Sequence, residues 1–406
     1  MSGTAKREVG GQKSNPLGVS SELSVGRTTE PGAGSSAQAR YIMIGGFLGA
    51  GKTTSVARLA QRLTDQGLRV GVITNDQGSG LVDTAFLRSR GFATEEIPGG
   101  CFCCRFNSLV EAANKLSAAT RPDVFIAEPV GSCTDLVATV SYPLRRIYGE
   151  NFSVAPLSVL VDPARAQRVF GLESGARFSE KVLYIYRKQL EEADVIVINK
   201  CELIEPTRRR MLSEALAGEF PRAVIFEASA RRGDGLEAWF NHIVAAQPSG
   251  RRAMEVDYDL YAEGEALLGW LNATLRLEAG HAFDANALLR RLAGGIQKRL
   301  ERAGAEVAHL KMTFSPDESL GEIAVTNLVR NDYVPEVSQS IEEPVQRGQL
   351  IINLRAEAPP DALREAVENA TAGLAGDCDG LQAKVQHLEH FRPGKPQPTH
   401  RITSWT

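Results

Sequence analysis

The chain has 406 residues, enough for two or three domains of about 100–200 residues each, and 43% of them are hydrophobic while 23% are charged. This composition is typical of a soluble globular protein, and a formal net charge of −3 excludes a global basic field for nucleic acid or an anionic membrane. No apolar run approaches the roughly 18 residues of a membrane span, so we expect no nucleic-acid partner and no membrane partner.

The N-terminal segment, residues 1–40, is rich in Gly, Ser and charged residues and lacks the apolar core of a secretory signal. We interpret it as a disordered tail, with a docking peptide for a partner as the alternative. A cytoplasmic location is therefore expected, where thiols stay reduced. Three of the six cysteines fall within positions 101–104, which favours a metal or redox site over a disulfide framework.

Residues 41–247 alternate short, almost wholly apolar runs with helix-like stretches such as 55–67. Strands that are apolar on both faces are typical of a parallel sheet covered by helices, so we predict an α/β domain with a mostly parallel sheet. The runs predicted to be strands are 41–46, 69–76, 123–129, 158–163, 194–200 and 223–229.

The polar tract 247–257 contains Pro and Gly and marks a domain boundary. Residues 256–390 then follow the order β-α-β-β-β-α-β, with helices at 284–304 and 361–373. This order predicts a smaller α+β domain, in which a split β-α-β sheet carries its helices on one face. Residues 391–406 are interpreted as a second tail.

The stretch GGFLGAGKTT directly follows the first predicted strand and opens the first predicted helix. Gly46, Gly51, Lys52 and Thr53 fit the phosphate-loop pattern G-x-x-x-x-G-K-[ST], which predicts a P-loop NTPase domain. Glycines let backbone N–H groups surround phosphate oxygens at a helix N-terminus, Lys52 reaches the β- and γ-phosphates, and the Thr53 hydroxyl ligates Mg²⁺. The predicted nucleotide contacts in this loop are Gly46, Gly49, Ala50, Gly51, Lys52, Thr53 and Thr54.

Two later segments predict which base is bound. NKCE places Asn199, Lys200 and Glu202 after a buried strand, where an N-K-x-D pattern binds guanine through its acidic residue. Glu202 replaces the aspartate and has a longer reach, so a weaker guanine preference is expected; a plain strand-end turn is the alternative. Ser229 and Ala230 lie where a backbone amide could contact the guanine O6. These residues favour GTP over ATP, with an ATP-dependent small-molecule kinase as a competing function.

Acidic residues after two other strands are candidates for the Mg²⁺ site. Glu128 ends a strand that resembles a Walker-B strand, so we expect it to hold Mg²⁺ directly or through water, with a capping role as the alternative. The polar loop 74–83 is where a nucleotide-sensing switch is expected. Asp76, Gln77 and Asp83 are its candidates for sensing Mg²⁺ or positioning water. The catalytic set is predicted as Lys52, Glu128 and Asp76.

Together, GGFLGAGKTT, TNDQGSGLVD, GGCFCC, EPVG and NKCE resemble the G3E family of P-loop GTPases in its CobW-like branch, the CobW/HypB/UreG-like proteins. These motifs span about residues 42–202. The resemblance implies a GTPase that handles metals, chiefly zinc and in some members cobalt or cobalamin; its relatives include the nickel GTPases of urease and hydrogenase maturation. Asp76 departs from the family's usual glutamate in NEFG, and residues 256–390 contain no motif of the better-studied CobW C-terminal domain.

Cys101, Cys103 and Cys104 offer three soft ligands, which favour Zn²⁺, Cu(I) or Co²⁺ over Mg²⁺. Three protein ligands leave one tetrahedral position open, as suits a metal that is passed on, whereas closed structural zinc sites use four. Water, Glu95, Glu96 or a histidine are the candidates for the fourth position. A structural cysteine cluster and a redox switch between Cys101 and Cys104 are the alternatives.

The remaining cysteines and the histidines give weaker signals. Cys133 and Cys201 are interpreted as small hydrophobic residues, and Cys378 as an exposed thiol. His387 and His390 are close in sequence, but three positions apart on a strand they would point to opposite faces, which argues against a shared metal.

The order of the motifs suggests how they work together. The thiols lie between the switch loop and the Glu128 strand, so metal affinity is expected to differ between GTP and GDP states. The expected function is a GTP-binding and GTP-hydrolysing metallochaperone with slow turnover, which uses GTP, Mg²⁺ and Zn²⁺ and delivers metal to a client metalloprotein. A GTP-dependent metal or cobalamin (corrinoid) sensor without a delivery role is the alternative, and a homodimer is left open.

Overall fold

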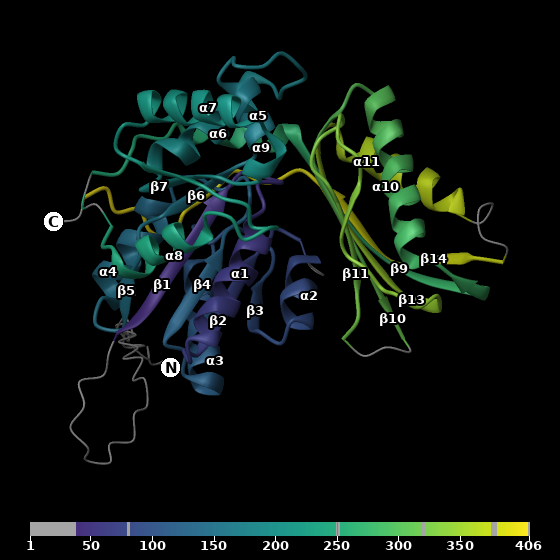
Figure 1. The fold of residues 1–406 in the computed structure, drawn as a ribbon, viewed down its shortest axis with the longest axis horizontal. Helices are drawn as coiled ribbons and strands as arrows, with labels where there is room; N and C mark the ends of the chain where they lie inside the picture. The colour runs from purple at the N-terminus through teal and green to yellow at the C-terminus, as the bar shows by residue number, and fades with distance from the viewer. Residues whose placement is uncertain are drawn as a thin grey trace, which may run out of the picture. The chain divides into compact units, whose positions relative to one another are not determined.

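The computed structural model describes residues 38–78, 82–248, 250, 252–317, 321–374 and 380–404, all within one compact unit, Gln38–Thr406. Most of the predicted N-terminal tail, and Cys378, lie outside these described residues. Two sheets organise the described chain (Figure 1). None of its helices has the length and apolar character needed to cross a membrane.

The first sheet has eight strands in the order β3-β2-β4-β1-β6-β7-β8, with β5 paired to β1, and its strand pairs are parallel. This confirms the predicted α/β class. Two strands were not predicted: β3 is an edge strand with the polar sequence ATEEI, and β5 has three residues. The strands are β1 (Ala39–Gly46), β2 (Val70–Asn75), β3 (Ala93–Ile97), β4 (Val124–Glu128), β5 (Phe152–Val154), β6 (Ser158–Val161), β7 (Val195–Ile198) and β8 (Val224–Glu227).

Helices cover both faces of this sheet. Tyr41 and Met43 of β1 pack into a core with residues of α3 and α6, whereas Ile42 and Ile44 pack into another with residues of α1 and α8. Successive side chains of a strand point to opposite faces, which is why the strand sequences are apolar throughout. The helices are α1 (Lys52–Asp65), α2 (Val82–Ser89), α3 (Phe106–Thr120), the π-helix η1 (Val137–Ser141), α4 (Tyr142–Tyr148), α5 (Pro163–Val169), α6 (Glu180–Glu192), the 3₁₀ turn η2 (Cys201–Leu203), α7 (Pro206–Glu219) and α8 (Leu236–Ala245).

The second sheet is antiparallel and has six strands in the order β12-β11-β10-β13-β9-β14. It confirms the predicted separate α+β part, and adds α9 and the four-residue β12, which the sequence pattern did not indicate. Its elements are α9 (Tyr258–Leu267), β9 (Leu268–Phe283), α10 (Ala285–Arg302), β10 (Glu306–Pro316), β11 (Ala324–Leu328), β12 (Glu336–Gln339), β13 (Val345–Glu357), α11 (Pro360–Ala372) and β14 (Gln382–Phe391).

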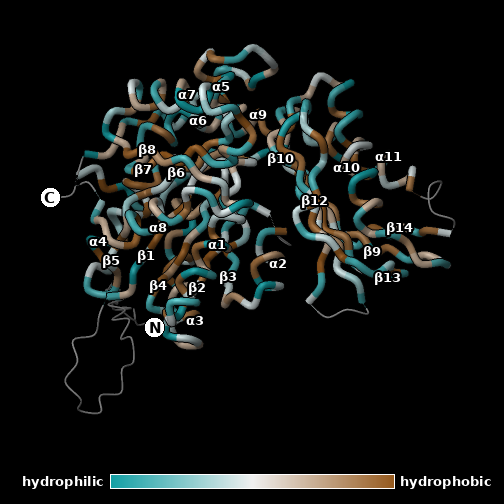
Figure 2. The backbone as a smooth tube through the Cα atoms, viewed as in Figure 1, coloured by the Kyte–Doolittle hydropathy of each residue, from teal (hydrophilic) through white to brown (hydrophobic). Residues whose placement is uncertain are grey.

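The two faces of the second sheet differ in chemistry. Leu354 of β13 belongs to an apolar core with residues of α10 and α11, so its neighbours Asn353 and Arg355 point to the opposite face. Lys311 of β10, whose two neighbours belong to the same core, shares that opposite face. Hydrophobic residues gather along the strands of both sheets (Figure 2). The polar face of the second sheet differs, because its Lys311 and Arg355 contact Asp83 and Asp76 of the part of the chain that carries the first sheet.

Residues 392–404, which follow β14, lie against the part of the chain that carries the first sheet. The Thr399 amide donates to the Cys103 carbonyl over 2.8 Å, and the Ile402 amide donates to the Ala138 carbonyl over 2.8 Å. The segment interpreted from the sequence as a tail thus makes specific backbone contacts, one of them to a cysteine of the C-x-C-C motif.

Candidate functional site

The loop between β1 and α1 turns tightly on glycines. Gly46, Gly49 and Gly51 have φ angles of 128°, 78° and 91°, in the left-handed region that favours glycine. A Cβ on Gly46 would lie 2.4 Å from the carbonyl oxygen of Leu160 on β6. Lys52, the first residue of α1, donates from Nζ to the Gly46 carbonyl over 2.9 Å, and burial lowers its pKa to about 8. The loop therefore places an amine and a helix N-terminus at one small concavity.

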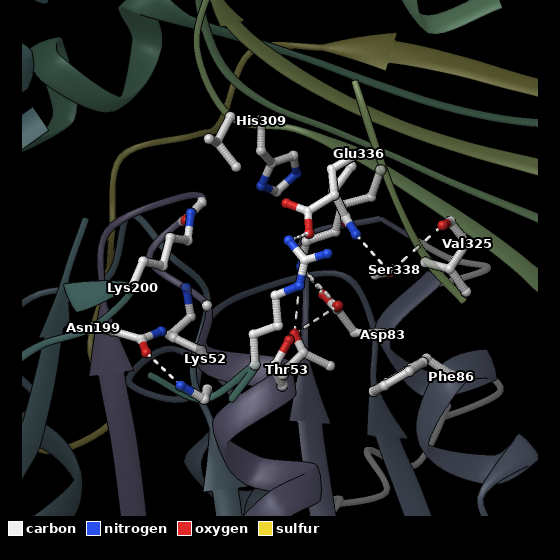
Figure 3. A pocket seen from close by; sticks show the side chains of 18 of the residues that line it. Lys52, Thr53, Asp83, Phe86, Asn199, Lys200, His309, Val325, Glu336 and Ser338 are labelled. Carbon is white, nitrogen blue, oxygen red and sulfur yellow. Dashed lines mark hydrogen bonds and ion pairs between the residues drawn. The ribbon is translucent and has the colours of Figure 1, made fainter. Parts of the chain in front are cut away.

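A cavity of about 290 Å³ lies at this loop. Figure 3 shows Lys52, Thr53 and Asp83 on the side of the first sheet, with His309 and Glu336 facing them from the second. Segments far apart in the sequence thus meet at one cavity close to the lower size limit of small-molecule pockets. The residues predicted for the nucleotide, Mg²⁺ or catalytic site that line the cavity are Gly49, Gly51, Lys52, Thr53, Thr54, Glu128, Asn199, Lys200, Glu202 and Ala230. The residues predicted for the same site that do not line the cavity are Gly46, Ala50, Asp76 and Ser229.

Two carboxylates meet at one hydroxyl in this cavity. Thr53 Oγ1 lies 2.7 Å from Asp83 Oδ1 and 2.9 Å from Glu128 Oε1. The hydroxyl has one hydrogen, so it can donate to only one of them. Burial and the charge of Asp83 raise the pKa of Glu128 to about 7. Burial acts to raise the pKa of Asp83 too, but the ammonium of Lys311 holds it below its ordinary value.

These oxygens fit Mg²⁺. A hydroxyl and carboxylates are the hard ligands that this ion prefers. Glu128 Oε2 is buried and has no hydrogen-bond partner among the described residues, as expected of an atom that a cation would satisfy. Thr53, Asp83 and Glu128 are therefore the residues that would hold Mg²⁺.

The NKCE segment contacts the phosphate loop. Asn199 Nδ2 donates to the Ala50 carbonyl over 2.8 Å, and its Oδ1 accepts from the Ala230 amide over 3.0 Å. Lys200, with a left-handed φ of 57°, donates from Nζ to the Gly49 carbonyl over 2.7 Å. The side chains of Asn199 and Lys200 thus hold the NKCE segment and the backbone at Ala230 against the phosphate loop.

The residues predicted to recognise the base differ in their hydrogen bonding in the structure. Glu202 lines the cavity, and its Oε2 is buried without a hydrogen-bond partner among the described residues. The Ser229 amide donates to the Asp234 carbonyl over 2.9 Å, and the Ala230 amide donates to Asn199. Both amides thus have acceptors within the chain, and a contact from either of them to guanine O6 stays a prediction.

The three candidate switch residues have different partners. Asp83 reaches Thr53, as described above. Asp76 accepts from Arg355 of β13 over 3.0 and 3.2 Å, and Gln77 Nε2 lies 3.5 Å from Glu265 Oε1. Of the three, Asp83 is the one at the candidate Mg²⁺ site, while Asp76 contacts the second sheet.

The C-x-C-C cysteines form one cluster between β3 and α3. Their Sγ atoms are 2.7 Å apart for Cys101 and Cys103, 3.3 Å for Cys101 and Cys104, and 3.7 Å for Cys103 and Cys104. In a tetrahedral zinc site with Zn–S bonds of about 2.3 Å, two sulfurs lie about 3.8 Å apart. Zinc binding would therefore lengthen the distances from the Cys101 sulfur to the Cys103 and Cys104 sulfurs by about 1 Å or less. Hydrogen bonding with the Cys103 and Cys104 thiols holds the pKa of Cys101 well below its ordinary value. The cluster thus favours a thiolate.

Among the described residues, this cluster is the one group of three or more His, Cys, Asp or Glu side chains placed to hold a metal ion, and it does not include Glu95 or Glu96. Cys133, expected as a small hydrophobic residue, is buried and hydrogen-bonds to the Cys101 thiol. His387 and His390 lie on β14, near Glu389 and Asp361 respectively, at 3.9 and 3.8 Å.

One side chain joins the start of the switch loop to the loop that carries the cysteines. Asn75, the last residue of β2, donates from Nδ2 to the carbonyls of Ile97 and Gly100 over 2.9 and 2.6 Å. Gly100 directly precedes Cys101. The start of the switch loop and the start of the cysteine loop are therefore held together by one side chain.

Residues 40–225 match the CobW/HypB/UreG nucleotide-binding domain. This stretch, a little under half of the chain, is therefore similar to the CobW/HypB/UreG nucleotide-binding domain. The zinc chaperone YeiR of Escherichia coli (strain K12) is 30% identical over 176 residues, 43% of this chain and 50% of that protein. The zinc chaperone CobW of a Sinorhizobium species is 29% identical over 202 residues, 44% of this chain and 56% of that protein. The chain thus spans about half the length of these curated relatives.

Two solved structures resemble the fold at low identity. HypB from Helicobacter pylori in complex with nickel is 21% identical, with 51% of this chain and 86% of that chain covered and a TM-score of 0.37. The Zn(II)-bound YjiA GTPase from E. coli is 14% identical, with 82% and 99% covered and a TM-score of 0.34. At these TM-scores neither structure adds to the assignment of the site.

The second sheet brings to the first-sheet domain two cations that sequence reasoning missed. Lys311 contacts Asp83, and Arg355 contacts Asp76. Neither lies in a motif, and a single basic residue on an alternating strand gives no local signal of a site. A loop with conspicuous acidic residues and no lysine or arginine of its own, as in TNDQGSGLVD, is the one indication that cations from elsewhere are needed.

Proposed function

We propose that this chain is a GTP-binding and GTP-hydrolysing metallochaperone that binds Zn²⁺ at Cys101, Cys103 and Cys104 and delivers it to a client metalloprotein under nucleotide control. The observation that carries the proposal is the three-thiol cluster, connected through Asn75 to the loop that contacts the nucleotide cavity. The zinc chaperones among the relatives support the choice of metal.

The nucleotide chemistry would rest on the residues of the cavity. Lys52 lies where it can neutralise the β- and γ-phosphates, and Glu202 offers its free carboxylate oxygen to the guanine N1–H and N2–H₂. Mg²⁺, held by Thr53, Asp83 and Glu128, would neutralise charge on the transferred phosphoryl group. No glutamine is among the described residues that line the cavity, so we propose slow intrinsic hydrolysis.

Nucleotide control would act through the start of the switch loop. Loss of the γ-phosphate changes the contacts that such loops make. Asn75 would transmit a shift of this loop to the Gly100 carbonyl and hence to the backbone of Cys101. Since sulfur positions set metal affinity, we propose that the GTP-bound and GDP-bound forms hold zinc differently.

An anaerobic zinc titration tests the metal site and its coupling. Zinc affinity is measured by competition with a colorimetric chelator, once with GDP and once with a non-hydrolysable GTP analogue. We expect one zinc per chain and affinities that differ at least roughly tenfold, about 1.4 kcal/mol. Cys101→Ser should lose this site, and the matched control Cys201→Ser, outside the cluster, should keep it. Equal affinities in both nucleotide states would contradict the coupling.

Delivery is tested by transfer of zinc to an acceptor. Zinc-loaded protein is mixed with a zinc-free chelator, and the transfer rate is followed during GTP turnover, with GDP, and with the analogue. Faster transfer during turnover supports a chaperone. Nucleotide-dependent affinity without faster transfer would contradict delivery and favour a metal sensor.

A further inference from the structure

Lys311 of the second sheet extends its ammonium group into the proposed Mg²⁺ site. Its Nζ lies 2.6 and 2.7 Å from the two carboxylate oxygens of Asp83 and 3.4 Å from the Thr53 hydroxyl. Asp83 and Thr53 also contact each other directly. The ammonium therefore binds the same oxygen atoms that a divalent ion at this site would use.

A positive charge at this position has a clear physical cause. Asp83 and Glu128 both contact the Thr53 hydroxyl, and two carboxylates converging on one oxygen repel unless a cation lies beside them. Lys52 does not take this role, because its Nζ is bound to carbonyls of the phosphate loop. Lys311 supplies the charge from another sheet, across 228 residues of sequence.

The ammonium and a divalent ion are mutually exclusive here. Mg²⁺ binds oxygen at about 2.0–2.1 Å, so an ion on Asp83 would lie within the space that Lys311 Nζ takes, and two cations at that distance repel. The backbone of Lys311 is fixed, since β10 is an inner strand that pairs with β11 on one side and β13 on the other. Only the flexible side chain can withdraw.

We propose that Lys311 competes with Mg²⁺ for Asp83 and Thr53, so that the second sheet sets the affinity of the nucleotide site for its divalent cation. The inference rests on the proposed nucleotide site. Lys311 must leave Asp83 when the cation binds, and its departure removes one contact between α2 and the second sheet. By linkage, whatever strengthens the attachment of the second sheet weakens Mg²⁺ binding by the same factor.

The contacts around Asp83 make this exchange local. The Val82 amide donates to Asn353 Oδ1 over 2.9 Å, and Asp76 contacts Arg355. Neither contact uses an atom of the proposed Mg²⁺ site. Release of Lys311 thus loosens the start of α2 without separating the two sheets, which permits a graded response.

The test uses the full chain and Mn²⁺, a paramagnetic substitute for Mg²⁺. Binding of Mn²⁺ to the protein is measured by EPR in the absence of nucleotide. Lys311→Met should bind Mn²⁺ roughly tenfold more tightly than wild type, about 1.4 kcal/mol. Lys311→Arg keeps the charge and should bind Mn²⁺ like wild type. The control Lys384→Met removes an exposed lysine from β14 of the same sheet and should have no effect.

A second measurement adds the nucleotide. The Mg²⁺ concentration that half-saturates binding of a fluorescent GTP analogue should fall roughly tenfold in Lys311→Met. Unchanged or weaker Mn²⁺ binding by Lys311→Met would overturn the competition even if wild type binds GTP normally. Failure of wild type to bind GTP would instead overturn the proposed nucleotide function, while the Mn²⁺ titration still decides the role of Lys311. If Lys311→Met does not fold, Lys311→Gln, neutral and able to donate to Asp83, carries the same expectation.

Discussion

Replacing Asp76 by asparagine removes the carboxylate that faces a guanidinium with no exposed surface. Arg355 Nη2 donates to both carboxylate oxygens over 3.0 and 3.2 Å, and the side chains of Arg355 and Asp76 are 0% and 13% exposed. The sequence suggests a role for Asp76 in Mg²⁺ sensing or catalysis, whereas its contacts in the structure hold the switch loop to the second sheet. If Asp76 acts in Mg²⁺ sensing or catalysis, Asp76→Asn should lose nucleotide chemistry. If Asp76 holds the switch loop to the second sheet, Asp76→Asn should lose stability.

The size of the expected effect follows from what Arg355 keeps. Its Nη1 donates to the carbonyls of Leu271 and Leu354 over 2.8 and 2.9 Å, and Nη2 donates to Asn272 Oδ1 over 2.8 Å. Its guanidinium carbon lies 3.9 Å from the centre of the Trp270 ring. Removing one partner of a buried ion pair costs about 3–5 kcal/mol. The remaining acceptors and the amide oxygen of the new asparagine reduce this, so we expect a loss of about 2 kcal/mol in the free energy of unfolding.

Urea unfolding followed by near-UV circular dichroism measures this loss, because the Trp270 ring stacks on the affected guanidinium. The control is Asp317→Asn, which breaks a pair with Arg276 in which the carboxylate is 36% exposed; surface pairs are worth about 0–1 kcal/mol. A loss for Asp76→Asn no larger than that of the control would refute the reasoning. So would full stability together with loss of Mg²⁺-dependent nucleotide binding, since that pattern belongs to a metal ligand.

Three further variants test the cavity and the core. Gly46→Ala places a Cβ 2.4 Å from the Leu160 carbonyl at a φ of 128°; nucleotide binding should be lost, and a normal melting temperature with normal binding would contradict this clash. Glu202→Gln removes the buried acceptor, so GTP affinity should fall roughly tenfold in competition with ATP; an unchanged preference would count against guanine recognition. Burial raises the pKa of Glu192 from 4.5 to about 8. The folded chain then keeps a proton that the unfolded chain loses, so this contribution to the unfolding free energy should decrease as pH rises from about 4.5 to 8. Glu192→Gln should flatten the pH dependence, leaving the contributions of Glu128 and Glu265, whose pKa values are also raised; parallel curves for both proteins would disprove it.

Six of the eight strands of the first sheet, and the side of the cavity that they carry, were predictable because their signals are local. Strands buried on both faces are apolar throughout, and the phosphate loop and NKCE have fixed places at strand ends. Helix α9 gave no such signal, since its buried side contains Tyr261, Gly264 and Glu265 rather than a stripe of aliphatic residues. Strand β12 is four residues long and reads EVSQ, which the apolar pattern cannot distinguish from a loop.

Contacts between distant segments could not be predicted in the same way. Lys311 and Arg355 alternate with core residues, which is also the pattern of a strand with one face in water. Only the packing of that face against the switch loop gives them partners. The approach of Cys133 to Cys101 likewise depends on the loops that follow β4 and β3, two strands that β2 separates in the sheet, and no pattern near either cysteine in the sequence indicates it.

The contacts of residues 392–404 also set the order in which the cysteine loop is completed during synthesis. The Gln397 amide donates to Cys104 Sγ over 3.1 Å, across 293 residues of sequence. At about 5–20 residues per second, the ribosome makes the second of these residues about 15–60 s after the first. For that interval the nascent chain presents its thiols without this neighbour, so Cys104 acquires its final surroundings only after translation has passed through the whole second sheet.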